Sequence, residues 1–197
     1  MENAILYPQL IKSSRALAEA IQGFATNKPE HLLVQRPGID KWSFLECIAH
    51  LNLTYADYLP KLQAAIEHNA ERKGSHFKQG FFGRMMINSM RPKKGKIKMK
   101  VKTFGKFQPT QEQLERKDVI DTFLTQHHKF INMLEAAQPL HGGQIRLDSA
   151  IGPLLRFRLG DCCAFLVGHN ERHWLQAKNA YAAVIEGDQH TAVNFIG

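Results

Sequence analysis

Two histidines stand four residues apart in the segment HNERH, at positions His169 and His173. On a helix, residues at this spacing lie one turn apart on the same face, so both imidazoles can bind one metal ion. A helical wheel surrounds both with apolar residues, which predicts that they point into the protein interior. Ten histidines in one chain also produce such spacings by chance. The spacing alone therefore leaves open a metal site or two packed or surface histidines.

A third metal ligand would have to come from another helix. His50 lies beyond the margin of the apolar face of its predicted helix, which suits either a ligand at a groove or a solvated surface residue. His127 falls on an apolar stripe and is a reserve candidate for the same role. The spacing does not choose between these readings, and the other histidines are predicted to lie in loops or at the surface.

Four stretches of the chain have the apolar periodicity of long helices, and we predict an all-α fold in which they form a four-helix bundle. The first and last run roughly from Ala4 to Phe24 and from Leu159 to Ile185. The second begins at the capping box of Ser43 and Glu46, and the third at a similar pattern, Thr110 with Gln113. The histidine pair lies on the last helix, which is expected to be the most buried.

The connection between the second and third predicted helices, from Gly74 to Pro109, has no sustained helical period. We expect a long irregular crossover, which allows the third helix to run parallel to the second. Within it, the segment from Lys96 to Lys102 alternates lysine with apolar residues, as in a short strand lying across the bundle. With this crossover included, residues 1–197 are expected to form a single domain.

The net charge of +8 is concentrated in one segment. Of the 26 lysines and arginines, eight lie between Arg91 and Lys106 without any acidic residue, and the other 18 equal the 18 acidic residues. This segment is either simply solvated or binds an anion, such as a phosphate, at Lys93 to Lys102. It lacks the aromatic interleaving of a single-strand binding surface and any helix-turn-helix pattern, which argues against nucleic acid as the partner.

Composition and apolar runs are those of an ordinary globular protein. Apolar residues make up 44% of the chain and charged residues 22%, which excludes a disordered chain. The longest apolar run, Cys162 to Val167, is far shorter than the roughly 20 residues of a membrane-spanning helix. The N-terminus lacks the features of a secretory signal, and three cysteines do not make a disulfide framework. We therefore expect a cytoplasmic protein with no membrane partner and with Cys162 and Cys163 buried.

Two segments resemble those of the DinB-like superfamily of four-helix metal-binding proteins. KWSFLECIAHL, from Lys41 to Leu51, is similar to the family's Trp-Ser opening of the second helix, with its histidine about two turns later. GHNERHWLQA, from Gly168 to Ala177, is similar to the family's His-x-x-x-His on the last helix. The resemblance covers nearly the whole chain, although the crossover and the third helix match only loosely. It implies a three-histidine metal site formed by His50, His169 and His173.

A site of three neutral imidazoles without a protein carboxylate leaves a coordination position open, as catalytic sites do. Zinc and nickel both accept imidazole, and the ligand type does not choose between them. Such a metal ion could activate water for hydrolysis or hold the sulfur of a low-molecular-weight thiol. The family's best-characterised relatives are thiol-dependent S-transferases and isomerases. The resemblance thus implies a metal-dependent S-transferase or hydrolase acting on a small molecule.

Several side chains on or beside the same helix faces are candidates for supporting the metal ligands or contacting a substrate, and each is equally open to a role in packing or at the surface. They are Cys47, Thr54, Asp57, Asn170 and Gln176. Asp57 or Glu46 is expected to orient His50 through its second ring nitrogen. No catalytic residue is assigned.

Two other functions stay open. The chain could be a non-catalytic stress-response module with a structural metal site, in which case removing the metal would melt the fold without loss of activity. It could also be a nucleic-acid-binding protein acting through Arg91 to Lys106, with strongly salt-dependent binding. A twofold homodimer is expected if the chain associates, because most soluble oligomers are twofold.

Overall fold

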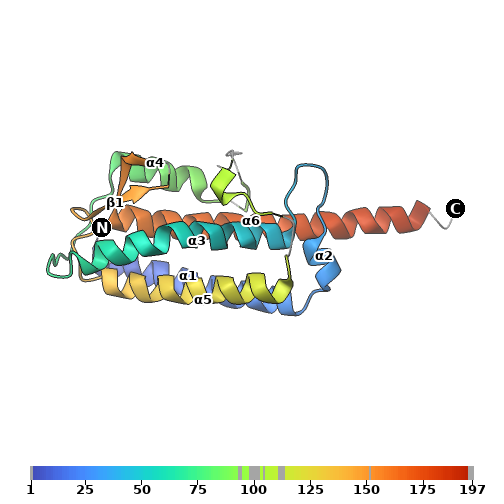
Figure 1. Cartoon of the computed structure of the whole chain (residues 1–197), viewed down its shortest axis with the longest axis horizontal. Coiled ribbons are helices and arrows are strands. Elements are labelled where there is room, and N and C mark those ends of the chain that lie inside the picture. The colour runs from blue at the N-terminus through green and yellow to red at the C-terminus, as the bar shows by residue number, and fades with distance from the viewer. Residues whose placement is uncertain are drawn as a thin grey trace.

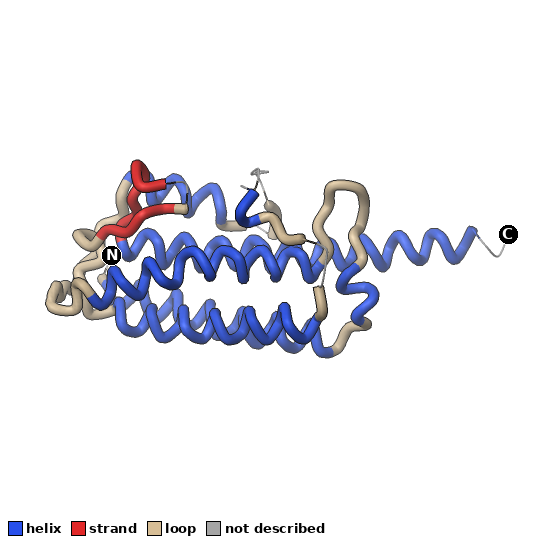
Figure 2. The backbone as a smooth tube through the Cα atoms, in the orientation of Figure 1, coloured by secondary structure: helices blue, strands red, loops and turns tan. Residues whose placement is uncertain are grey.

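The computed structural model describes residues 2–92, 95–97, 103, 105–110, 114–150 and 152–194, without the side chains of 153, 154 and 188–194. Four long helices lie side by side in it (Figure 1): α1 (Asn3–Thr26), α3 (Phe44–Glu67), α5 (Arg116–Ala137) and α6 (Leu159–Asn194). Both α1 and α3 pack against α5 and α6, and α6 extends beyond the other helices (Figure 2). The predicted mostly helical fold is confirmed. No helix of the described part is long and apolar enough to cross a membrane.

The direction of the helices follows from the colour ramp of Figure 1, in which α1 and α6 run one way and α3 and α5 the other. Side-chain contacts agree with this arrangement. Asn52 of α3 donates to the carbonyl of Val119 in α5 at 3.0 Å, and Tyr55 bonds His127 farther along both helices. The helices α3 and α5 are therefore parallel, as a long crossover between them allows. A short helix, α2 (Glu30–Val34), joins α1 to α3.

The crossover from α3 to α5 contains a helix that the sequence did not predict, α4 (Phe81–Met90), and a 3-10 turn, η1 (Gly105–Phe107). Ile87 of α4 is buried, and the helix packs against α6. Phe81 and Met85 are apolar but exposed. The helix has only ten residues, which is shorter than the stretch over which a helical period is recognised in a sequence. The expectation of an entirely irregular crossover is therefore wrong.

The lysine-rich part of the crossover lies mostly outside the described residues, which include only 95–97 of the range from 93 to 102. The strand expected at Lys96 to Lys102 and the anion site expected at Lys93 to Lys102 therefore stay predictions.

The described strands form a hairpin between α5 and α6, drawn in red in Figure 2. Strand β1 (Arg146–Ser149) pairs antiparallel with β2 (Gly152–Arg158). Leu147 and Phe157 lie opposite each other in this pairing and are both buried. This hairpin was not predicted from the sequence, because the strands are short and β2 itself opens with Gly152 and Pro153, a pair typical of turns.

Helix α3 starts at its predicted capping box. Ser43 Oγ accepts a hydrogen bond from the Glu46 amide at 3.1 Å, and Glu46 Oε2 accepts one from the Ser43 amide at 2.8 Å. Burial alone would raise the pKa of the Glu46 carboxyl, but hydrogen bonds from Arg36 and Ser43 hold it below its ordinary value. A negative charge is thereby kept in the first turn of α3, where the helix dipole favours it.

Helix α5 begins at Arg116 and not at the capping box expected from Thr110 and Gln113, of which Gln113 lies outside the described residues. Its N-cap residue, Glu115, makes no capping hydrogen bond through its side chain. Glu30 Oε1 instead accepts a hydrogen bond from the Arg116 amide at 2.9 Å. The predicted start is wrong because a contact from α2 satisfies this helix end in place of a local cap.

Replacing Ser43 by alanine is expected to lower the free energy of unfolding by about 1 kcal/mol, because an amide of the first turn of α3 loses its acceptor. Urea unfolding measures the change. The control is Thr122→Ala, at an exposed position of α5, which should change the free energy by less than about 0.5 kcal/mol. An unchanged midpoint in Ser43→Ala would show that the capping box adds no stability.

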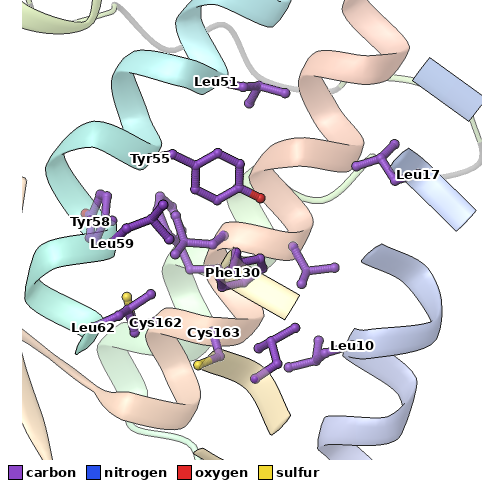
Figure 3. Close-up of a cluster of buried hydrophobic side chains, with 14 of the residues drawn as sticks. Leu10, Leu17, Leu51, Tyr55, Tyr58, Leu59, Leu62, Phe130, Cys162 and Cys163 are labelled. Atoms are coloured by element: carbon purple, nitrogen blue, oxygen red, sulfur yellow. The ribbon is translucent and has the colours of Figure 1, made fainter. Parts of the chain in front are cut away.

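The core fills the space between the four long helices. In the close-up of Figure 3, Leu10 of α1, Tyr55 of α3 and Phe130 of α5 lie among the side chains that pack together around α6. Cys162 and Cys163 lie on the first turns of α6 and are buried, as predicted, and neither forms a disulfide. Burial raises the pKa of both thiols, which keeps them protonated. This packing fixes the position of α6 along its axis relative to α3. It therefore also fixes where the histidines of the two helices meet.

Candidate metal centre

Three buried histidines meet where α3 packs against α6. His50 comes from α3, whereas His169 and His173 come from successive turns of α6. Their ring centroids are 5.1, 4.3 and 4.5 Å apart. One ring nitrogen of each lies within 4.8 Å of those of the other two, and the side chains are only 4%, 7% and 7% exposed. The structure thus brings together the three histidines of the predicted site.

The tautomer of His50 is set by a backbone contact. Its Nδ1 lies 2.7 Å from the carbonyl oxygen of Phe107, and a carbonyl can only accept, so Nδ1 carries the proton. The lone pair of the neutral ring is therefore on Nε2, which lies 3.3 Å from His169 Nε2. Two nitrogens bound tetrahedrally to zinc are also roughly 3.3 Å apart, given Zn–N distances near 2.05 Å. The spacing of these nitrogens thus fits a shared metal ion.

The three imidazoles are held in the neutral form that metals bind. Burial lowers the pKa of each ring, and for His169 and His173 the neighbouring rings and Arg172 lower it further. The Nδ1 atoms of His169 and His173 have no hydrogen-bond partner within the described part of the chain. A buried polar atom left in this state costs about 1–3 kcal/mol. A metal ion shared by the facing Nε2 atoms of His50 and His169 would leave the Nδ1 atom of His169 in this state. The fit to a metal rests instead on the donor set, since three neutral imidazoles suit zinc or nickel.

Apolar rings enclose the histidines on several sides. The Trp42 ring lies 5.0 Å from the His50 ring and 6.1 Å from the His173 ring, measured between centroids. Phe165 packs against His169 at 5.7 Å. These rings limit the contact of the imidazoles with water, which strengthens electrostatic interactions inside the site.

Three of the predicted supporting residues lie close to the histidines. Thr54 Oγ1 donates to the backbone carbonyl of His50 at 3.0 Å, so it contacts the helix and not the ring. Burial lowers the pKa of His173, and the side chain of Gln176 partly offsets this by favouring the protonated ring. Cys47, one turn before His50, is fully buried in the core. Because burial raises its pKa, Cys47 is a neutral thiol at neutral pH and not a nucleophile.

The prediction that Asp57 or Glu46 orients His50 is wrong. Asp57 forms ion pairs with Lys61 at 2.6 Å and Lys106 at 3.0 Å, and Glu46 pairs with Arg36. Both carboxylates are drawn away by cations, and the carbonyl of Phe107 takes the role assigned to them.

Asn170 and His127 belong to a separate buried network. His127 Nε2 donates to the carbonyl of Ser14 in α1 at 2.8 Å, which leaves Nδ1 to accept from the Tyr55 hydroxyl at 2.6 Å. The Tyr55 oxygen in turn accepts from Asn170 Nδ2 at 2.6 Å. Both nitrogens of His127 are engaged, so the reserve ligand is not available to a metal. Asn170 contacts Tyr55 and joins α6 to this network, which links all four long helices.

Tyr55→Phe is expected to lower the free energy of unfolding by about 2 kcal/mol. The substitution leaves the buried His127 Nδ1 and Asn170 Nδ2 without their shared partner, and each unsatisfied group costs roughly 1–3 kcal/mol before relaxation. Urea unfolding checks this value. Tyr181→Phe, at a half-buried position of α6, is the matched control and should be nearly neutral. A stability equal to that of the wild type would mean that the network is not needed.

The sequence model of the DinB superfamily matches residues 9–177, a range that includes all three histidines. The chain belongs to the DinB superfamily. The predicted resemblance is thereby confirmed over most of the chain, from α1 into α6. No curated protein and no solved structure matches the chain.

Two features of this DinB site were not among the predicted residues. Trp42 was not singled out for the site, although it stands about two turns before His50 in the same sequence motif. That position is a signal that could have placed it near the histidine. Phe107 acts through its backbone carbonyl, and every residue type has one. No sequence pattern could have identified it.

Proposed function

We propose that His50, His169 and His173 bind one divalent metal ion, zinc or nickel, and that the chain is a metal-dependent enzyme acting on a small molecule. The observation that carries the proposal is the approach of three buried, neutral imidazoles to within 4.8 Å, in a group without a carboxylate or a thiol. Three imidazoles leave a coordination position open, as in catalytic sites.

The reaction is proposed to be either the transfer of a small thiol or a hydrolysis. A metal ion bound here would supply Lewis acidity, to the sulfur of a thiol in the first case and to water in the second. The nucleophile comes from solution, since Cys47 is buried and protonated. Membership of the DinB superfamily favours the thiol, because the superfamily's best-characterised members use one.

Elemental analysis of the purified protein tests this proposal. About one zinc or nickel per chain is expected in the wild type and none in His50→Ala or His173→Ala. His128→Ala is the control, because His128 is exposed on α5 and should not affect the metal content. A wild-type protein without metal after incubation with zinc or nickel would refute the proposal. If metal is present, the wild type is then screened for activity with low-molecular-weight thiols and electrophilic substrates. His169→Ala, which lacks one of the proposed ligands, is the negative control.

A structural metal site in a non-catalytic module is the second candidate. The burial of all three histidines favours it, because a structural site needs no access for a substrate. If the site is structural, a chelator would lower the melting temperature. When cobalt replaces the metal in the protein, adding a thiol or a substrate would leave the absorption spectrum of the cobalt ion unchanged. A spectral change on adding a thiol would exclude it in favour of an open site.

A further inference from the structure

The crossover returns to the bundle directly over the histidines. Its 3-10 turn η1 lies against α3, and the Phe107 side chain is buried there. The same residue places its carbonyl oxygen 2.7 Å from His50 Nδ1. The turn η1 thus supplies the atom that determines which nitrogen of His50 carries the proton.

One ion pair fastens this turn to α3. Lys106 Nζ lies 3.0 Å from Asp57 Oδ1 and 4.7 Å above the centre of the Phe107 ring. The other carboxylate oxygen, Asp57 Oδ2, lies 2.6 Å from Lys61 within α3. Burial alone would raise the pKa of Asp57, but the two lysines hold it below its ordinary value, so the carboxylate is charged at neutral pH. Lys106 and Phe107 are adjacent, so holding the first also holds the carbonyl of the second.

We propose that Asp57 and Lys106 are positioning residues that clasp the crossover to α3, so that the carbonyl of Phe107 fixes His50 with its proton on Nδ1. This inference rests on the proposed metal site. A neutral imidazole released from such a contact exchanges its proton between the two nitrogens. The tautomer with a proton on Nε2 has no lone pair there to offer to a metal. Breaking this ion pair therefore lowers the fraction of molecules in which His50 has its proton on Nδ1 and can bind a metal ion through Nε2.

The test compares three variants, each at a residue of this ion-pair group. Lys106→Met and Asp57→Asn break the clasp, whereas Lys61→Met removes the other partner of the same carboxylate and leaves the clasp intact. Nitrogen-15 NMR of histidine-labelled, metal-free protein reports directly which nitrogen of His50 is protonated. We expect a single Nδ1–H tautomer in the wild type and Lys61→Met, and a mixture in Lys106→Met and Asp57→Asn. A purely structural role for the ion pair would not move this signal.

Zinc affinity is then measured by competition with a chromophoric chelator. We expect Lys106→Met and Asp57→Asn to bind zinc about 3- to 10-fold more weakly, at the lower end of what changes around metal ligands cause. Raising the salt concentration should weaken zinc binding more in the wild type than in these variants, because the clasp is partly exposed to solvent. Lys61→Met should behave like the wild type in both experiments.

An unchanged tautomer and affinity in Lys106→Met and Asp57→Asn would overturn the clasp, as would equal effects in Lys61→Met. Wild-type protein that binds neither zinc nor nickel would instead overturn the proposed function. The tautomer signal, recorded without metal, would even then support or overturn the clasp by itself. Failure of the clasp and failure of the metal site are therefore distinguishable.

Discussion

Adding zinc or nickel to the metal-free protein is expected to raise its melting temperature by roughly 8–16 °C when the metal concentration is a thousandfold above the Kd. An ion that binds only the folded chain stabilises it by about 4 kcal/mol at that excess. In a protein of this size, each kcal/mol raises the melting temperature by roughly 2–4 °C. Differential scanning fluorimetry with and without metal measures the shift.

Variants of single histidines locate the origin of this shift. His169→Gln should lose nearly all of it, because two imidazoles do not hold the ion at the same concentration. His128→Gln changes an exposed histidine of α5 and should keep the full shift. The readout is the difference between metal-bound and metal-free protein, so a change in the stability of the metal-free variant does not affect it. An undiminished shift in His169→Gln would place the metal elsewhere in the chain.

Acid is expected to destabilise the protein between about pH 6.5 and pH 4 through His127. Burial lowers the pKa of this imidazole to about 4, whereas in the unfolded chain it is about 6.5. As the pH falls, the unfolded chain therefore takes up the proton first, and the free energy of unfolding decreases. The stabilising contribution is fully present above pH 6.5, and about 3 kcal/mol of it has been lost by pH 4.

Urea unfolding of metal-free protein at pH 7 and at pH 4.5 measures this effect. The loss of stability between the two pH values should be about 2–3 kcal/mol smaller in His127→Gln than in the wild type. His50, His169 and His173 also have lowered pKa values, but they are present in both proteins and cancel in the comparison. His31→Gln, at an exposed position, should lose as much stability as the wild type. The same loss in His127→Gln would mean that this ring is not buried as a neutral group.

The sequence predicted those parts of the fold that depend on local periodicity. The long helices are recognisable because each buries one apolar face, and Ser43 with Glu46 marks the start of α3 through bonds between near neighbours. His169 and His173 share a face by the geometry of any helix. The place of His50 could not be derived in the same way. It depends on how α3 and α6 pack, and only the resemblance to a family pointed to it.

What the sequence missed was decided by contacts between distant segments. The start of α5 depends on Glu30, which accepts a hydrogen bond from the Arg116 amide. Asp57 does not orient His50 because it pairs with Lys106, 49 residues away. His127 has the burial expected of a ligand, yet its partners Ser14 and Tyr55 occupy both of its nitrogens. In each case the residue type was informative, but the competing partner was visible only in the fold.

The parallel arrangement of α3 and α5 has a consequence for how such a protein can diversify. Antiparallel neighbours are joined by short loops at the ends of a bundle, whereas parallel neighbours require a connection that travels the length of the molecule. Here that connection passes over the histidines and contributes the Phe107 carbonyl to them. Surface connections tolerate insertions and substitutions far better than packed helices do. Changes in the length or charge of the crossover can therefore alter the surroundings of the histidines while the four helices that carry them stay the same.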